Sequence, residues 1–367
     1  MNHLNIVNFV GLQNFIMMKK RIFLSVLLIL LPLPFVMAQG PEVVIPVPAE
    51  VSVNKGTYRF RKNPKIRMVE VAEDSIPSES YRLEIHRRKG ITITFSDSAG
   101  RYYALQTLNQ MSADGAIREL QCCEIYDCPR FPYRGLHFDV SRHFRSVDFL
   151  KKQMDAMAMF KMNMMHIHLT DAAGWRMPVD AYPRLTSFAA WRPQHTWKEW
   201  WAGDRHYVEE GTAGAYGGYY SKEELRDLVE YARSRNVTII PEIEMPSHSE
   251  EVLAAYPELG CSGEAYKDSD FCVGNEEVFK FLETVLDEVM DVFPSEYIHI
   301  GGDEAGKQHW KTCPKCQKRM MDEGLKDVDE LQSYMIKRMA RYIESKGRKV
   351  IGWDEILDGG LAEGATV

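Results

Sequence analysis

The chain has 367 residues, of which 45% are hydrophobic and 26% are charged, and its formal net charge is −7 at pH 7. This length allows roughly one to three domains with a sizeable buried core. The acidic balance, without a basic stripe along the sequence, argues against nucleic acid as a partner. The composition is therefore that of a soluble globular protein whose ligand is not a nucleic acid.

Residues 1–38 have the pattern of a signal peptide. A short positive segment precedes an apolar run over residues 22–37 that contains two prolines, and small residues suit cleavage after Ala38. A start at Met17 or Met18 would remove an upstream extension that a signal does not need. A transmembrane anchor is the alternative, but the run is short and carries prolines. We expect an exported protein (periplasmic, cell-surface or secreted) with no stable membrane span after signal cleavage.

Residues 41–128 predict a small α+β domain. Two strand-like segments come first, and an alternating apolar–polar pattern then indicates a hairpin with one buried face. A stretch with apolar residues at helical spacing follows. None of these elements carries candidate catalytic chemistry, so we interpret the unit as a supporting domain. The expected elements are strands at residues 43–46, 56–60, 81–85 and 90–95 and a helix at residues 98–111.

From residue 130 onward, strands alternate with helices, which is typical of parallel β/α units. Polar residues follow the strands at their C-terminal ends, where a (β/α)8 barrel builds its active site. A doubly wound sheet is the alternative, but the first strand lacks a glycine-rich phosphate turn. We expect strands at residues 136–140, 164–169, 237–241, 297–300 and 349–353, with helices at residues 147–162, 221–236 and 275–293 and two more before the last strand.

The predicted fold is therefore a (β/α)8 TIM-type barrel over residues 130–367, preceded by the α+β domain. Five strands are found, with residues 365–367 as the start of a possible sixth, whereas a closed barrel needs eight. We expect the barrel to be C-terminally incomplete, either because the sequence is a fragment or because the sheet is open. An open parallel sheet would leave a bare edge.

Two adjacent carboxylates, Asp303 and Glu304, follow a short apolar strand and two glycines. Neighbouring side chains of a regular strand point to opposite faces, so both acids could not serve one substrate there. Gly301 and Gly302 relax this limit, because glycine adopts positive φ and lets the backbone bend. A pair of acids at the tip of a buried strand suits acid catalysis of glycoside cleavage. The alternative is a solvated Asp-Glu pair at the start of a helix.

Several ordered blocks resemble the family 20 glycoside hydrolases, the β-N-acetylhexosaminidases. Residues 297–304 and residues 134–144 carry the resemblance most clearly, and the α+β unit is similar to that family's accessory domain in abbreviated form. The further matching blocks are residues 163–171 with 174–176, residues 241–248 and residues 352–355.

The resemblance implies substrate-assisted catalysis, in which the acetamido oxygen of the substrate attacks the anomeric carbon. It implies that Glu304 is the general acid and then the base for water, and that Asp303 holds the acetamido N–H and stabilises the developing positive charge. It also assigns substrate-binding roles to four other residues. Arg142 would bind the outer hydroxyls of the sugar, Asp171 and His248 would tune the acid, and Trp353 would wall the acetamido pocket.

Each assignment has a structural alternative, and the chain departs from the family pattern in places. Arg142 could pair with Asp139, His248 could be structural, and Trp353 could belong to the core. The family usually has Asp-Gln after the first aspartate where this chain has two alanines at 172 and 173, and it has aspartate and glycine at positions 244 and 247, where glutamate and serine stand here. The acetamido-orienting tyrosine and the tryptophans of the family's last strands would lie beyond residue 367.

Seven cysteines leave at least one unpaired within the chain. Cys261 and Cys272 flank a short polar loop and are the first pair we expect to form a disulfide. Cys313 and Cys316 have the spacing of half a zinc site, but no second pair lies nearby at suitable spacing in the sequence. We therefore expect a local disulfide or free thiols, no metal site and no cofactor.

Residues 191–220 hold four tryptophans among polar and glycine residues, in a loop longer than barrels usually have. This segment is either an aglycone subsite or a structural excursion. We predict an exported glycosidase that removes terminal β-linked N-acetylhexosamine from a glycan or glycoconjugate. The alternatives are a relative specific for a sulfated or disaccharide terminus and a non-catalytic carbohydrate-binding barrel, against which the intact acid pair argues.

Overall fold

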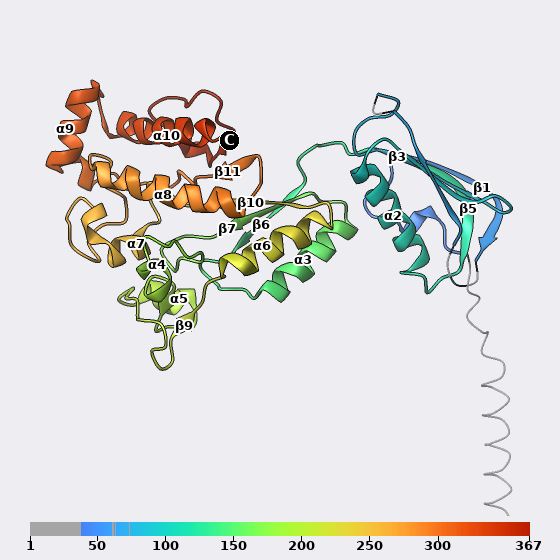
Figure 1. Ribbon diagram of the computed structural model, residues 1–367, viewed down its shortest axis with the longest axis horizontal. Coiled ribbons are helices and arrows are strands. Elements are labelled where there is room, and N and C mark those ends of the chain that lie inside the picture. Colours follow the sequence, from blue (N-terminus) through green and yellow to red (C-terminus); the bar gives the residue numbers. More distant parts are fainter. Residues whose placement is uncertain (1–37, 61, 63, 73) are drawn as a thin grey trace, which may run out of the picture.

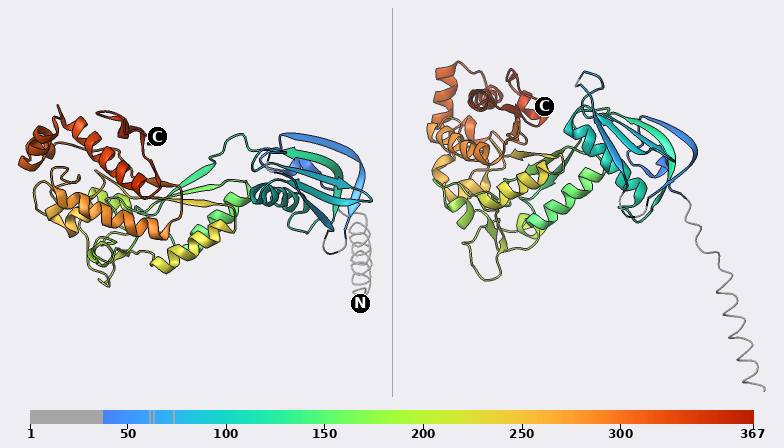
Figure 2. Two further views of the ribbon diagram at one scale, coloured as in Figure 1. Left: turned by 45° about the horizontal axis from the view of Figure 1, so that its top comes forward. Right: turned by 45° about the vertical axis from the view of Figure 1, so that its right-hand side comes forward.

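The computed structural model describes residues 38–60, 62, 64–72 and 74–367, which form two lobes joined by a narrow waist (Figure 1). The predicted signal peptide lies outside the described residues, except for Ala38. Among the residues described, no helix is both long enough and apolar enough to cross a bilayer. Two further views show that each lobe has its own sheet (Figure 2).

The N-terminal lobe is a five-stranded mixed sheet with the strand order β1-β5-β3-β4-β2. Helix α2 (Ser98–Ser112) covers one face, because its apolar stripe packs on the inward side chains of the strands. The predicted hairpin and this helix are confirmed. The strands are β1 (Glu50–Arg59), β2 (Ile66–Glu70), β3 (Tyr81–His86), β4 (Gly90–Phe95) and β5 (Glu119–Asp127).

The strand predicted at residues 43–46 is wrong. A short 3-10 helix, η1 (Pro41–Val43), occupies part of this segment, and Gln110 of α2 bonds the backbone of Ile45 in place of a ladder partner. Proline at the first helical position favours this turn, and prolines on both sides leave few backbone donors for a sheet. Sequence reasoning also missed β2 and β5.

The C-terminal lobe is built on a second five-stranded sheet, which is entirely parallel and has the order β12-β11-β10-β7-β6. The strands follow one another in chain order across the sheet, whereas a doubly wound sheet reverses its direction at a switch point. The predicted barrel-type fold is therefore confirmed, as an open arc within the described residues. The strands are β6 (Gly135–Asp139), β7 (Met164–His168), β10 (Thr238–Glu242), β11 (Tyr297–His299) and β12 (Lys349–Ile351).

Helices cover the outer face of this arc, and neighbouring helices also pack on each other. Helix α6 begins with the predicted capping box, in which Ser221 and Glu224 exchange side-chain and backbone hydrogen bonds. The helices are α3 (Val147–Met159), α6 (Lys222–Arg233), α8 (Glu276–Val292), α9 (Pro314–Glu323) and α10 (Val328–Ser345).

Side chains alternate along the parallel strands between the two faces of the sheet. In β7, Met165 and Ile167 join the hydrophobic core shared with the helices. His166 and His168 point to the opposite face, yet they are also buried. At β7, the inner face of the arc is therefore polar but shielded from solvent.

Longer excursions follow the C-terminal ends of the strands. Between β7 and α6 the chain forms α4 (Arg184–Ser187), β8 (Trp191–Arg192), α5 (Trp197–Ala202) and β9 (Tyr216–Gly217). After β10 come α7 (Glu250–Ala255) and η2 (Pro257–Leu259), and after β11 comes η3 (His309–Lys311). After β12 the chain forms η4 (Asp354–Leu357).

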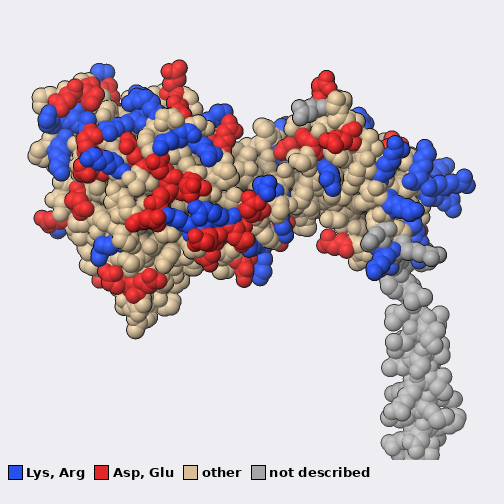
Figure 3. Space-filling model, in the orientation of Figure 1, with Lys and Arg blue, Asp and Glu red and all other residues tan. Residues whose placement is uncertain are grey.

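The two lobes meet in a polar junction. Lys161 pairs with Asp127 at 2.6 Å, and Arg134 pairs with Glu79 at 2.9 Å. Two hollows of about 900 and 540 Å³ lie along this junction, and neither contains a predicted catalytic residue. On the face shown in Figure 3, basic and acidic side chains are mixed over the C-terminal lobe, whereas basic side chains gather at the far end of the N-terminal lobe.

Candidate active site

Five of the six predicted site residues gather at the C-terminal ends of four neighbouring strands. Arg142 follows β6, Asp171 follows β7, His248 follows β10, and Asp303 with Glu304 follows β11. Because parallel strands present these ends at one edge of a sheet, residues up to 162 positions apart in the chain come together. We call this group (Arg142, Asp171, His248, Asp303 and Glu304) the carboxyl-end site.

The members of the carboxyl-end site form a continuous chain of charged contacts. Arg142 Nη2 lies 2.6 Å from Asp171 Oδ2, and Asp171 Oδ1 lies 3.6 Å from His248 Nδ1. On its other side, His248 Nε2 lies 3.3 Å from Asp303 Oδ2 and 3.5 Å from Glu304 Oε2. His248 therefore links the buried aspartate to the acid pair.

The two linked groups shift each other's pKa in opposite directions. Burial works against protonation of His248, but the adjacent Asp303 carboxylate and the charge of Asp171 outweigh it, so the pKa of His248 is raised. Burial acts in the same way against ionisation of Asp303, yet the adjacent His248 leaves the pKa of Asp303 lowered. The geometry thus favours an ionised Asp303 beside a protonated His248.

Arg142 also forms the ion pair with Asp139 that was predicted as its structural role, because Nη1 lies 3.1 Å from Asp139 Oδ2. The guanidinium is thus held between Asp139 and Asp171. About a third of the side chain (31%) remains exposed, so the group keeps donors available at the surface. A fixed guanidinium with free donors suits recognition of hydroxyl groups.

The turn that carries the acid pair requires its glycines. Gly301 and Gly302 have φ values of 64° and 103°, as predicted. A Cβ atom on Gly301 would collide with the carboxylate of Glu244, and one on Gly302 would collide with Ile356. Glu304 itself has φ of 52°, a conformation that is uncommon outside glycine and that tends to occur at functional sites.

Backbone contacts from three other segments hold this turn in place. The backbone N–H of Glu304 donates to the side chain of Glu355, and the Ser247 hydroxyl donates to the Glu304 carbonyl at 3.3 Å. Gln332 Nε2 donates to the carbonyl of Gly302 at 2.9 Å, and the Trp353 N–H donates to that of Gly301 at 2.9 Å. The Glu304 side chain is 74% exposed, so its carboxyl group can reach a ligand from a fixed backbone.

Trp353 lies on the inner face of the arc, one layer below the carboxyl-end site. Its indole Nε1 donates to Glu242 Oε1 at 2.9 Å, and its ring packs against those of His137, His166 and His299. The predicted role of Trp353 as a pocket wall stays a prediction. Its contact with Glu242 connects it, through His168, to Arg142 and Asp171.

Glu242 is the centre of a polar layer to which the sequence interpretation assigned no role. His166 Nε2, His168 Nδ1 and His299 Nδ1 lie 2.8, 2.5 and 2.9 Å from its carboxylate oxygens. We call His137, His166, His168, His299 and Glu242 the histidine layer. It is directly below the carboxyl-end site, because His168 Nε2 lies 2.9 Å from Asp171 Oδ2.

A signal for this layer exists in the sequence. His166 and His168 alternate with apolar residues in β7, so two polar side chains repeat on one face of a strand that is otherwise apolar.

Charges and hydrogen bonds determine the protonation states in the histidine layer. Burial opposes charge on His168, but Glu242 and Asp171 raise its pKa well above the usual range. Burial also opposes ionisation of Glu242, but the charge of His168 and bonds to the histidines lower its pKa.

The departures from the family pattern have physical consequences. Glu244 is buried against Gly301 with both carboxylate oxygens lacking a hydrogen-bond partner, and burial, together with the charge of Glu242, raises its pKa well above the ordinary value. His168, Asp171 and Glu244 lie close enough to share a cation, but His168 is already bonded to Glu242 and Asp171. Hydrogen bonds thus hold His168 and Asp171, whereas Glu244 lies beside them with neither oxygen bonded.

The alanines at positions 172 and 173 make room for the tryptophan-rich excursion. Both are buried in a small cluster with Trp200 and Tyr207, so Trp200 is a core residue. Trp197 and Trp201 stack with ring centroids 5.4 Å apart, and Trp201 is 43% exposed. The aglycone subsite stays a prediction, and Trp197 and Trp201 are now its candidate residues.

The predicted disulfide between Cys261 and Cys272 is wrong, because both thiols are free. The expectation that Cys313 and Cys316 lack a second pair nearby is also wrong. The fold brings Cys261 and Cys272 to them from the preceding loop, and the four sulfurs lie within 4.8 Å of one another. Sequence spacing could not reveal this, since the two pairs come from loops after different strands.

Comparisons with known proteins agree with this geometry. The sequence model of "Glycosyl hydrolase family 20, catalytic domain" matches residues 131–367, and that of "Glycosyl hydrolase family 20, domain 2" matches residues 50–128. A beta-hexosaminidase of Porphyromonas gingivalis is 43% identical over 308 residues, which are 80% of this chain and 38% of that protein. One from Akkermansia muciniphila is 33% identical over 335 residues, which are 88% of this chain and 64% of that protein.

Solved structures give the same result. The beta-N-acetylhexosaminidase from Bacteroides fragilis superposes with a TM-score of 0.74 at 32% identity, covering 86% of this chain and 67% of that one. An exo beta-N-acetylglucosaminidase from Vibrio harveyi, solved with N-acetylglucosamine, gives 0.76 at 28% identity, covering 87% and 55%. This chain thus spans 38% and 64% of the lengths of the two curated relatives, which is less than two thirds of either.

Proposed function

Because the chain belongs to glycoside hydrolase family 20, we propose that its carboxyl-end site removes terminal β-linked N-acetylhexosamine from glycans. The observation that supports this most is the unbroken chain of contacts from Arg142 through Asp171 and His248 to Asp303 and Glu304. A fixed guanidinium, an ionised carboxylate and an exposed carboxyl group at one edge are the groups that such a reaction needs.

In the proposed first step, the acetamido oxygen of the substrate bonds to the anomeric carbon while the bond to the leaving oxygen breaks. Glu304 transfers its proton to that leaving oxygen, so the aglycone departs neutral. The sugar is left as a cyclic oxazolinium ion. Asp303, whose pKa is lowered by His248, stays ionised and faces the positive charge that develops on the acetamido group.

In the second step, water attacks the anomeric carbon from the face that the aglycone left. The Glu304 carboxylate accepts a proton from this water, and the acetamido oxygen is released from the ring. Two inversions at one carbon give net retention. Glu304 regains its proton in this step, so the site is ready for another cycle.

The test of this mechanism is Asp303→Asn in the full-length protein, with a thiazoline analogue of the oxazolinium ion as ligand. Asparagine keeps the shape of the side chain and an acceptor for His248, but it removes the charge. Because intermediate analogues bind at least ~10²-fold tighter than substrates, we expect most of that excess affinity and most turnover to disappear together. Asp291→Asn, on the exposed face of α8, is the matched control and should change neither.

A direct carboxylate nucleophile is the competing mechanism. It would hydrolyse the corresponding 2-hydroxy glucoside at a comparable rate, and a 2-fluoro sugar would leave a glycosyl adduct on Asp303. Detection of that adduct by mass spectrometry would overturn the substrate-assisted proposal. Tight thiazoline binding by the Asp303→Asn protein would contradict the role given to this residue.

We also propose export, on the signal-like pattern of residues 1–38. The position of Gln39 supports this, because its backbone is hydrogen bonded to Glu119 and Gln121 of β5, directly after the proposed cleavage point. N-terminal sequencing of the protein from its native cells tests the proposal. A mature chain that begins at Gln39 is expected, and a retained signal segment would contradict it.

A further inference from the structure

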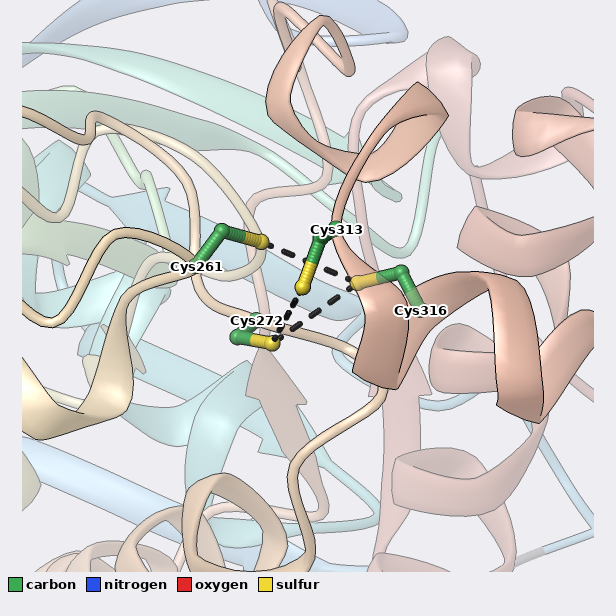
Figure 4. Close-up of side chains that lie close together, drawn as sticks. All are labelled: Cys261, Cys272, Cys313 and Cys316. Carbon is green, nitrogen blue, oxygen red and sulfur yellow. Dashed lines mark hydrogen bonds between the residues drawn. The ribbon is translucent and has the colours of Figure 1, made fainter.

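Four cysteines outside the carboxyl-end site converge on one point in the C-terminal lobe (Figure 4). Cys261 and Cys272 come from the loop after β10, and Cys313 and Cys316 stand at the start of helix α9, after β11. We call these residues the four-cysteine cluster. The other cysteines of the chain, Cys122, Cys123 and Cys128, belong to the N-terminal lobe.

The sulfur spacings suit four ligands of one ion better than a disulfide, because all four sulfurs lie within 4.8 Å of one another. Cys272 Sγ lies 3.7 Å from both Cys313 Sγ and Cys316 Sγ, and Cys316 Sγ lies 3.7 Å from Cys261 Sγ. Four thiolates around one zinc ion at about 2.3 Å from the metal would be about 3.8 Å apart. A disulfide needs about 2.05 Å between two sulfurs, and the equal distances around Cys272 favour no particular partner.

The cluster is enclosed by protein. Cys272 and Cys316 are fully buried, Cys313 is 5% exposed, and Cys261 is half-buried. An enclosed four-ligand site leaves no open coordination position, which is the arrangement of structural and not catalytic zinc. Four converging thiols also form a soft donor set, which selects zinc over calcium or magnesium.

The backbone around the cluster holds the ligands in place. The Cys272 N–H donates to the Leu259 carbonyl at 2.9 Å, and the Cys313 N–H donates to the His309 carbonyl at 2.9 Å. Gly274 lies against the backbone between Lys315 and Cys316, where any Cβ atom would collide. The two loops therefore approach more closely than side chains would otherwise allow.

We propose that the four-cysteine cluster binds one zinc ion, with all four thiolates as ligands and no bound water. Binding releases the thiol protons to solvent, and no oxidation is involved. This proposal does not rest on the proposed glycosidase activity, because it depends only on the sulfur geometry and its burial.

The site would fasten together the two loops that support the candidate acid. The Phe271 N–H, next to Cys272, donates to the carbonyl of Pro246, two residues before His248, at 2.8 Å. The Lys307 N–H, three residues after Glu304, donates to Asp270 Oδ2 at 2.8 Å. The indole of Trp310 donates to the Phe271 carbonyl at 2.9 Å. Loss of the ion is therefore expected to loosen His248 and the acid pair together.

The experiment measures metal content directly. The full-length protein is purified without a metal-affinity tag from the compartment in which it resides, and elemental analysis then gives metal per chain. We expect one zinc per chain in the wild type and almost none in Cys272→Ser and Cys316→Ser. Cys128→Ser, which changes a half-buried cysteine in the other lobe, is the matched control and should retain the full amount.

Two further measurements keep the proposal testable if a serine variant fails to fold. Cobalt exchanged into the wild-type protein should give the intense thiolate charge-transfer absorption and the visible bands of a tetrahedral site. Removal of the zinc by a strong chelator should lower the melting temperature of the wild type and of Cys128→Ser alike.

Three results would overturn the proposal. The first is metal-free wild-type protein whose intact mass, without reductant, shows the loss of two or four hydrogens to disulfides. The second is iron in place of zinc at one ion per chain. The third is full zinc content in folded Cys272→Ser and Cys316→Ser, which would assign the metal to another site.

Discussion

The two lobes each contain a five-stranded sheet, but the side chains that the two sheets bury differ in polarity. In the N-terminal sheet, inward positions such as Leu83, Ile85 and Ile93 are apolar and fully buried under α2. In the C-terminal sheet, one face packs on helices in the same manner, whereas the other buries four members of the histidine layer, namely His166, His168, His299 and Glu242. The first sheet follows the rule for a stable core, and the second departs from it on one face only.

This difference indicates where function is located. Burying a charged group costs free energy unless it is paired, so a buried Glu242 with three histidines is expected only where it serves a purpose. Natural proteins depart from consistent packing mainly at functional sites. The histidine layer lies directly below the carboxyl-end site, and the regular N-terminal sheet has no comparable feature among its described residues.

The largest expected effect comes from Glu304→Gln, which should remove activity without removing stability. The side chain is exposed, so its replacement disturbs little packing, but the proton donor is lost. We expect turnover of N-acetylglucosaminides with poor leaving groups to fall ~10²–10⁴-fold. Nitrophenyl substrates should lose less, because their leaving groups need less protonation. Steady-state kinetics on both substrate types, with thermal melting, measures this.

Glu296→Gln is the matched control for this change. Glu296 lies just before β11, at the opposite end of the same strand, and pairs with Lys349 at the surface. Its replacement should leave both kinetics and melting close to wild type. Equal loss of Glu304→Gln activity on both substrate types would mean that Glu304 is not the leaving-group acid.

The second prediction compares a polar buried residue of the C-terminal sheet with an apolar buried residue of the N-terminal sheet. Glu242→Gln removes the charge that offsets His168, so we expect a loss of about 3–5 kcal/mol in the free energy of unfolding. Because His168 also contacts Arg142 and Asp171, turnover should fall as well, by up to ~10²-fold. Denaturant unfolding and kinetics on the same preparations measure both.

Leu83→Ala in the N-terminal sheet supplies the comparison for Glu242→Gln. It leaves a cavity in an apolar core and should cost about 2–5 kcal/mol, which is a similar loss of stability. Turnover by the folded protein should be unchanged. If Leu83→Ala lowers turnover as much as Glu242→Gln does, the histidine layer has no special link to the site.

The smallest expected effect is a pH dependence of stability from Glu250. One carboxylate oxygen of this residue is buried without a hydrogen bond. Burial, with the charge of Asp171, raises the pKa of Glu250 from 4.5 to about 7. The folded state thus binds this proton more tightly than the unfolded state, so the contribution of Glu250 to stability is fully present below pH 4.5 and is lost as the pH rises through about 7.

Glu250→Gln should reduce the slope of the free energy of unfolding against pH, by at most about 1.4 kcal/mol per pH unit. Melting temperatures of the variant and wild type between pH 4 and 8 measure the difference. Glu264→Gln, at an exposed position in the next loop, is the control and should keep the wild-type slope. A variant that loses stability in parallel with the wild type would contradict the raised pKa of Glu250.

Much of the fold could be predicted because its determinants are local. Alternation in residues 81–95, helical spacing in residues 98–111 and the Ser221–Glu224 capping box each correspond to an observed element. The acid pair could also be located, because two glycines and two acids at the end of an apolar strand are contiguous in sequence. The error at residues 43–46 arose because prolines favoured a 3-10 turn over a strand-like composition.

The cysteine prediction failed for a different reason. A disulfide between Cys261 and Cys272 was inferred from their closeness in the chain, whereas the nearest sulfurs come from Cys313 and Cys316, 41 to 55 residues away. Chain separation says little about distance once two loops pack side by side. The role of Glu242 was missed in the same way, since its partners come from β6, β7, β11 and the segment after β12.

The sequence by itself determined most of the strands and helices, and where each strand of the C-terminal sheet delivers polar residues. Periodicity, caps and glycine turns act over a few residues, so they can be read directly along the chain. Tertiary structure alone decided which of those residues meet. Parallel packing brings His248 between Asp171 and Asp303, gathers the histidines around Glu242 and places four thiols on one point. These contacts depend on strand order and loop packing, which arise from burial of the whole core, so the local sequence does not specify which residues meet.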